Sequence, residues 1–145
     1  MAVVGLTPPD LALGPSIPAQ WQRFSHYVGN VQGAVDDSCT YGTCGRYFPE
    51  DGTTEYICAM EVGEGAELPP EFDEIVVPAQ RYARLTHRGH ITTIFSTLDA
   101  IFSEWLPSSG YRKKQAPHTY IEHYGDAFNP RTGLGSLDIW IALED

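Results

Sequence analysis

The sequence predicts an α+β fold in which two pseudo-symmetric strand-helix-strand-strand modules form one antiparallel sheet with two main helices. Three features indicate it: two amphipathic helical stripes, short segments in which apolar and polar residues alternate, and the same order of elements in both halves. The chain has 145 residues, of which 42% are apolar and 19% are charged, and this composition suits a single core. We therefore expect one domain over residues 1–145.

The first half begins with a short apolar run, Ala2–Leu6, that ends at a proline-rich turn. Ser16 is a suitable N-cap, and Pro18 suits the first turn of a helix. From there apolar residues recur at intervals of three and four, which predicts a helix with one buried face: Ile17, Trp21, Phe24, Val28 and Val31.

Two strands and a loop follow this helix. Thr40–Phe48 is rich in tyrosine and glycine, and a turn at 49–52 separates it from the alternating segment Thr53–Val62. Gly63–Asp73 is acidic and contains two prolines, so we expect a loop there.

The second half contains the clearest helix of the chain. Strand-like segments at Glu74–Val77 and Gln80–His87 lead into an apolar stripe at helical spacing, which Pro107 is expected to terminate. Two further strands are predicted at His118–Tyr124 and Leu137–Leu143, joined by a loop that contains proline and glycine. The helical stripe consists of Ile91, Ile94, Phe95, Leu98, Ile101, Phe102, Trp105 and Leu106.

The two halves also match at individual positions. The apolar residues at 17, 21, 24 and 28 fall on those at 91, 95, 98 and 102 at a constant offset. Glu55–Glu61 falls on Asp138–Glu144, with acidic residues at both ends and alanine in the same place. An internal repeat of about 1–62 and 80–145 would pair two half-domains about a pseudo-twofold axis and leave a ligand cleft between them.

The composition is acidic. Asp and Glu number 19 against 9 Lys and Arg, which gives a formal net charge of −10. Such a surface repels phosphate backbones, so we expect no direct binding of nucleic acid. The same charge suits a cationic ligand or a basic protein partner, although an acidic surface also serves solubility alone.

The expected location of the chain is the cytoplasm. Its N-terminus has no basic leader, and no apolar run approaches the roughly 20 residues that span a bilayer, so no membrane association is expected. The three cysteines, Cys39, Cys44 and Cys58, lack metal-ligand spacing and suit a reducing compartment. Cys58 lies inside an apolar strand and is expected to be a small core residue.

Common catalytic and cofactor motifs are absent. The sequence contains no phosphate-binding or dinucleotide-binding glycine loop, no nucleophile-elbow serine and no zinc-protease histidine pair. The histidine pairs His87/His90 and His118/His123 have no carboxylate or thiol that completes a recognised metal site. We therefore expect surface or hydrogen-bonded histidines, and neither a metal nor a cofactor.

The most informative segment for function is His118–Tyr124. In a strand, alternation places Tyr120, Glu122 and Tyr124 on one face, so a carboxylate lies between two tyrosines. One interpretation is an ordinary exposed glutamate on an edge strand. The other is a partly desolvated carboxylate in an aromatic cleft, where a cationic ligand would favour the charged form and each ring would add about 0.5–2 kcal/mol of cation–π attraction.

Five segments carry a resemblance to a known family: Ile17–Phe24, Tyr82–His90, Glu104–Tyr111, Ile121–Tyr124 and Leu137–Leu143. Together they are similar to the GyrI-like small-molecule-binding domains, which also form the effector-binding module of many AraC- and MerR-type bacterial transcription activators. The resemblance covers essentially the whole chain. No helix-turn-helix precedes it in this sequence, so the chain resembles the stand-alone members, and the regulator interpretation returns if it is an excised fragment.

The resemblance implies a cleft with a glutamate near its base that binds cationic or amphipathic ligands. By motif position that glutamate is Glu122. Aromatic side chains would complete the site, and the candidates are Trp21, Tyr41, Tyr56, Trp105, Tyr120 and Trp140.

Three functions follow from these expectations. The first is a multidrug-like module that binds a small molecule without catalysis. The second is a hydrolase of cyclopropane-containing toxins, an activity linked to stand-alone members of the family, with Glu122 as general acid or base. The third is an effector-binding domain of a transcription regulator, or a protein that inhibits a partner such as DNA gyrase. The sequence is also compatible with a homodimer that forms through exposed sheet edges.

Overall fold

The computed structural model describes residues 2–6, 16–28, 32–34, 39–48, 50, 53–67, 73–77, 80–116 and 119–144. In chain order the strands and helices are β1 (Ala2–Leu6), α1 (Ser16–Ser25), β2 (Gln32–Ala34), β3 (Thr40–Phe48), β4 (Thr53–Glu67), β5 (Asp73–Val76), β6 (Tyr82–Arg88), a 3₁₀ turn (Ile91–Thr93), α2 (Ile94–Ala100), a π-helical turn (Ile101–Trp105), α3 (Leu106–Ser109), β7 (Tyr120–Tyr124), β8 (Phe128–Asn129) and β9 (Leu134–Ala142).

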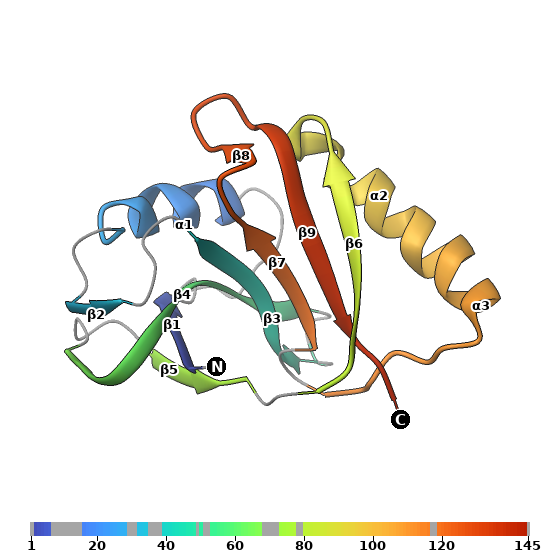
Figure 1. Ribbon diagram of the computed structural model, residues 1–145, viewed down its shortest axis with the longest axis horizontal. Helices are drawn as coiled ribbons and strands as arrows, with labels where there is room; N and C mark the ends of the chain where they lie inside the picture. Colours follow the sequence, from blue (N-terminus) through green and yellow to red (C-terminus); the bar gives the residue numbers. More distant parts are fainter. Residues whose placement is uncertain are drawn as a thin grey trace.

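The strands form an antiparallel sheet in the order β5-β1-β4-β3-β7-β9-β6, and off this path β2 pairs with β4 and β8 with β9. The ladder between β3 and β7 joins the strands of the first half of the chain to those of the second (Figure 1). An antiparallel sheet with two main helical segments confirms the predicted α+β fold.

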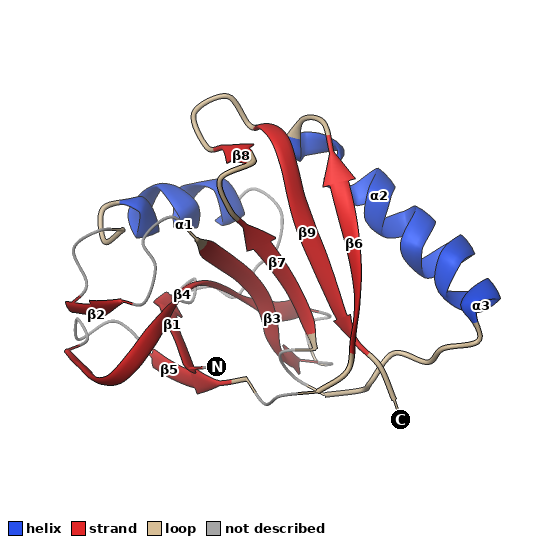
Figure 2. Cartoon of the chain, in the orientation of Figure 1, coloured by secondary structure: helices blue, strands red, loops and turns tan. Residues whose placement is uncertain are grey.

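Both helical segments lie on the same face of the sheet. Directly opposed residues point to the same face, and the register forms one such row from Cys58 through Gly42 and Glu122 to Ile139. Phe24 of α1 packs in a core cluster with Cys58, whereas the segment from α2 to α3 packs onto Ile139. Helix α1 therefore covers the β4 side of this face and α2 the β9 and β6 side, which leaves β7 between them (Figure 2).

The helix predicted to end at Pro107 continues to Ser109, so that prediction is wrong. Gly110 ends it with a positive φ of 82°, a conformation that glycine adopts without strain. A proline inside a helix lacks an N–H and collides with the carbonyl four residues earlier. Here the wider π-helical turn stands directly before Pro107, with the Leu106 N–H donating to the carbonyl of Ile101, and it accommodates the proline.

The apolar stripe of this helix is wider than its buried face. Ile94 and Ile101 are 7% and 4% exposed, whereas Phe95, expected in the stripe, is 67% exposed. The segment begins with a tighter 3₁₀ turn and contains a wider π turn before α3, so its face drifts relative to an ideal helix. None of the helices in the described ranges has both the length and the apolar character needed to cross a bilayer.

Strand boundaries agree with the prediction for β3 and differ where a strand pairs with a partner that was not predicted. Strand β3 matches the prediction, but β4 runs on to Glu67, where a loop was expected, because this extension pairs with β2. The loop expected before Leu137 contains β8 and the start of β9. Helix α1 ends at Ser25, earlier than predicted, while Val31 and His118 lie outside the described residues.

The contrast between Ile101 and Phe95 generates the first prediction. Ile101→Ala should lower the free energy of unfolding by about 2–5 kcal/mol, because it leaves a cavity in the core beneath the helix. Phe95→Ala removes a larger but exposed side chain and should change the free energy of unfolding by no more than about 0.5 kcal/mol. Urea unfolding followed by circular dichroism measures both, and equal losses in the two variants would contradict the assigned faces.

Candidate functional site

Glu122 lies in the middle of the sheet. Strand β7 pairs with β3 on one side and with β9 on the other, so Glu122 stands opposite both Gly42 and Ile139. The residue is only 6% exposed. The interpretation of Glu122 as an exposed glutamate on an edge strand is therefore wrong.

Three tyrosine hydroxyls donate hydrogen bonds to the Glu122 carboxylate. Tyr120, two residues earlier on the same face of β7, donates to Oε2 at 2.6 Å. Tyr124, two residues later, donates to Oε1 at 2.9 Å. Tyr56 reaches Oε1 at 2.5 Å from β4, across the intervening strand β3. Among the described residues, the hydrogen-bond donors to Glu122 are thus all neutral phenols.

The contact between Tyr56 and Glu122 depends on the glycine between them. Gly42 on β3 lies beside both side chains in the row across the sheet. A β-carbon built at this position would overlap the Tyr56 hydroxyl and lie 2.5 Å from Glu122 Oε1. Because Gly42 has no side chain, the Tyr56 hydroxyl and the Glu122 carboxylate have room to meet beside it.

Trp21 of α1 packs over this group. Its indole Nε1 donates to the Tyr56 hydroxyl oxygen at 3.2 Å, and its ring meets that of Tyr124 edge to face at 5.2 Å. Trp21 is partly buried and contacts the core clusters beneath both α1 and α2. We call Trp21, Tyr56, Tyr120, Glu122 and Tyr124 the carboxylate cluster.

The electrostatics of the cluster keep the phenols protonated. Burial, and after it the charge of Glu122, raise the pKa of Tyr56, Tyr120 and Tyr124 well above the ordinary value. The same two causes raise the pKa of the Cys44 thiol to about 12 and also raise that of Cys58. The tyrosines therefore act as donors, and neither thiol is activated as a nucleophile.

Two of the predicted aromatic residues lie on the opposite face of the sheet. Tyr41 is the neighbour of Gly42 in β3, and Trp140 follows Ile139 in β9, so alternation turns both away from Glu122. There His123 stacks on Trp140 with ring centroids 5.3 Å apart, and Tyr41 lies 5.2 Å from His123.

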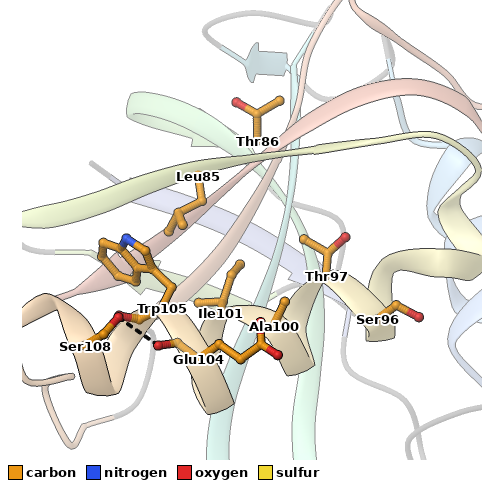
Figure 3. A pocket seen from close by; sticks show the side chains of 9 residues that line it. All are labelled: Leu85, Thr86, Ser96, Thr97, Ala100, Ile101, Glu104, Trp105 and Ser108. Carbon is orange, nitrogen blue, oxygen red and sulfur yellow. Dashed lines mark hydrogen bonds between the residues drawn. The ribbon is translucent and has the colours of Figure 1, made fainter.

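Trp105, the last of the predicted aromatic residues, lies in a separate groove of about 590 Å³ between β6 and the helix (Figure 3). Its lining comprises Leu85, Thr86, Ser96, Thr97, Ala100, Ile101, Glu104, Trp105 and Ser108. The structure thus brings Trp21, Tyr56 and Tyr120 together with Glu122 and leaves Tyr41, Trp105 and Trp140 elsewhere.

Sequence analysis omitted two members of the site. Tyr124 was recognisable, because it shares a face of the strand with Glu122, but it was not among the candidates. Gly42 carried no recognisable signal, because its importance depends on two side chains from other strands.

His87 and His90 make contacts that stabilise the start of the long helix. His87 is 2% exposed, and its Nδ1 shares a hydrogen bond of 2.5 Å with the Thr97 hydroxyl. His90 caps the 3₁₀ turn by accepting from the Thr92 N–H. Within the described ranges, no group of three or more His, Cys, Asp or Glu side chains is placed to bind a metal ion.

The raised pKa values of the three tyrosines predict a loss of stability at alkaline pH. An unfolded tyrosine ionises near pH 10, whereas the folded groups stay protonated, so the free energy of unfolding should fall as pH rises above about 10. Below that pH these groups should add no pH dependence. Urea unfolding over this range should show a shallower fall for Tyr124→Phe than for the matched variant Tyr111→Phe at an exposed position. Parallel curves for the two variants would contradict the prediction.

The chain is similar to known proteins over nearly its whole length. A family model described as the GyrI-like small molecule binding domain matches residues 6–144. Over 143 residues the chain is 30% identical to the transcriptional regulator BrlR of Pseudomonas aeruginosa, and the match covers 98% of the chain and 52% of the regulator. The chain thus spans about half the length of this curated relative. It belongs to the GyrI-like small-molecule-binding domain family.

Proposed function

We propose that this domain binds cationic or amphipathic aromatic small molecules and that the Glu122 carboxylate pairs with the positive charge of the ligand. The observation that carries the proposal is a carboxylate, 6% exposed, whose described hydrogen-bond donors are all neutral phenols. Phenols satisfy the carboxylate oxygens but bring no opposite charge, so the site remains complementary to a cation.

The expected gain is sufficient for useful affinity. Two opposite charges about 4 Å apart attract by about 4 kcal/mol at the effective dielectric constant of about 20 that describes protein sites. Three tyrosines bond to the carboxylate and Trp21 bonds to one of them, so aromatic rings lie close to it, and a ring whose face meets the ligand cation adds roughly 0.5–2 kcal/mol. A lipophilic cation therefore suits the cluster better than a small hydrated ion does.

Trp21 is the side chain that we expect to move on binding. It is partly buried, whereas Tyr56 beneath it is 4% exposed, so Trp21 forms the outer part of the cluster. Its hydrogen bond to the Tyr56 hydroxyl, at 3.2 Å, is the longest in the cluster. A ligand that reaches Glu122 will therefore change the surroundings of the indole and its fluorescence.

The test compares the two carboxylates that lie near tryptophan. Tetraphenylphosphonium should quench tryptophan fluorescence, and Glu122→Gln should weaken its binding by at least about tenfold, because the charge is lost while the shape is kept. Glu104→Gln removes the matched carboxylate beside Trp105 in the separate groove and should leave the affinity unchanged.

Two controls complete this test. Trp21→Phe should remove most of the fluorescence response, and thermal melting should show that Glu122→Gln remains folded. Affinity that survives Glu122→Gln but is lost in Glu104→Gln would contradict the proposal and assign the cation to the groove.

A second candidate function is the effector-binding part of a transcription regulator. It is favoured by the 30% identity to a transcriptional regulator of which the match covers 52%. The reading frame that contains this chain should then encode a DNA-binding segment as well. The ligand should change the affinity of that complete protein for a fragment of its own promoter, measured by fluorescence anisotropy. A reading frame with no further domain would contradict this candidate.

A further inference from the structure

Among the described strands, β6 is the last strand of the sheet, and one of its edges has no strand beside it. In the described part of the chain it pairs with β9 alone. The Gly89 N–H donates to the carbonyl of Gly135, and the Leu143 N–H donates to the carbonyl of Arg81, in the same register as the strand. Because bonded positions alternate in an antiparallel ladder, the N–H and C=O groups of Arg84, Thr86 and Arg88 point to the free edge.

The groove lined by Trp105 includes this edge. Leu85 and Thr86 are consecutive strand residues and both line it, although the Thr86 side chain points away from the helix and donates to Asp138 on the opposite face (Figure 3). The groove therefore meets Thr86 at its backbone, whose N–H and C=O point to the free edge of the strand. Its other wall is the helix from Ser96 to Ser108. The groove therefore combines unpaired backbone groups with a wall of side chains.

The two sides of the edge differ in their chemistry. On the helix side, the partly buried Leu85 and Trp105 offer apolar surface, and exposed Glu104 adds a negative charge. On the opposite side, Arg84 and Arg88 are exposed and point away from the helix, because they alternate with Leu85. A strand added here would meet apolar and acidic groups with one face and basic groups with the other.

We propose that β6 accepts an extended peptide segment of a partner protein as an additional strand. The segment carries apolar and basic side chains at the alternate positions that face the helix, and acidic side chains at those between them. Its backbone bonds to the free groups of Arg84 and Thr86, its apolar side chains lie on Trp105 and Leu85, and its basic side chain pairs with Glu104. This surface is separate from the carboxylate cluster, so the proposal does not depend on the proposed ligand.

The test uses a fluorescein-labelled peptide of about eight residues, with leucine and lysine alternating with glutamate in the predicted pattern. It should bind saturably in fluorescence anisotropy. A peptide N-methylated at the amides that face β6, and a peptide of the same composition in shuffled order, should each bind at least about tenfold more weakly. Glu104→Gln should weaken binding severalfold and reduce its dependence on salt.

Matched variants of Thr86 test the role of the strand edge. Thr86→Pro removes an N–H that points away from β9, so the sheet is retained while binding falls at least about tenfold. Thr86→Val keeps the N–H and should bind as the parent does. Circular dichroism checks that both variants fold, and the N-methylated peptide tests the same bonds without changing the protein.

Three results would overturn the proposal. Equal binding of the N-methylated or shuffled peptide would mean that no strand is added. Absence of saturable binding would mean that Arg84 and Arg88 only protect the edge from pairing. A dimer in sedimentation velocity that Thr86→Pro dissociates would mean that a second copy of the chain occupies this edge.

Discussion

A carboxylate in the middle of the sheet is tolerated only when its oxygens accept hydrogen bonds, and this requirement organises the molecule around Glu122. Three phenols donate these hydrogen bonds: Tyr56 comes from β4, and Tyr120 and Tyr124 are the neighbouring same-face residues of β7. One of them reaches the carboxylate only because Gly42 has no side chain. Trp21 then covers the group from α1, so the helix, three strands and one glycine are tied to the same buried charge.

The cluster also joins the two halves of the chain. Tyr56 comes from the first half and Glu122 from the second, and the β3–β7 ladder brings them into register. Because α1 covers one side of this face and α2 the other, the cluster lies where the two core clusters meet, and Trp21 contacts both. The groove beside β6 differs in physical character: it is open, it has an exposed carboxylate, and it offers backbone groups that the cluster lacks.

Elements with a strong local pattern were predictable from sequence. Strand β3 followed from its content of tyrosine and glycine, the core of β4 from alternation and the long second helix from helical spacing, and Cys58 is fully buried as expected. The errors arose where tertiary contacts outweigh local preference. Strand β4 extends through glycines because β2 pairs with it, and the helix passes Pro107 because a π turn makes room for the ring.

The candidate site was likewise predictable from the sequence only in part. That Tyr120, Glu122 and Tyr124 share one face follows from the amino-acid order alone, because alternation in a strand is a local property with a period of two residues. Strand pairing was needed to make β7 a central strand, to bring Tyr56 to the carboxylate while Tyr41 and Trp140 face away, and to place Trp105 in another groove. Those outcomes depend on which strands pair and in which register, and Tyr56 and Glu122 stand 66 positions apart in the chain. A shift of one residue in any of these ladders would exchange the two faces, and no local pattern specifies the pairing of such distant segments.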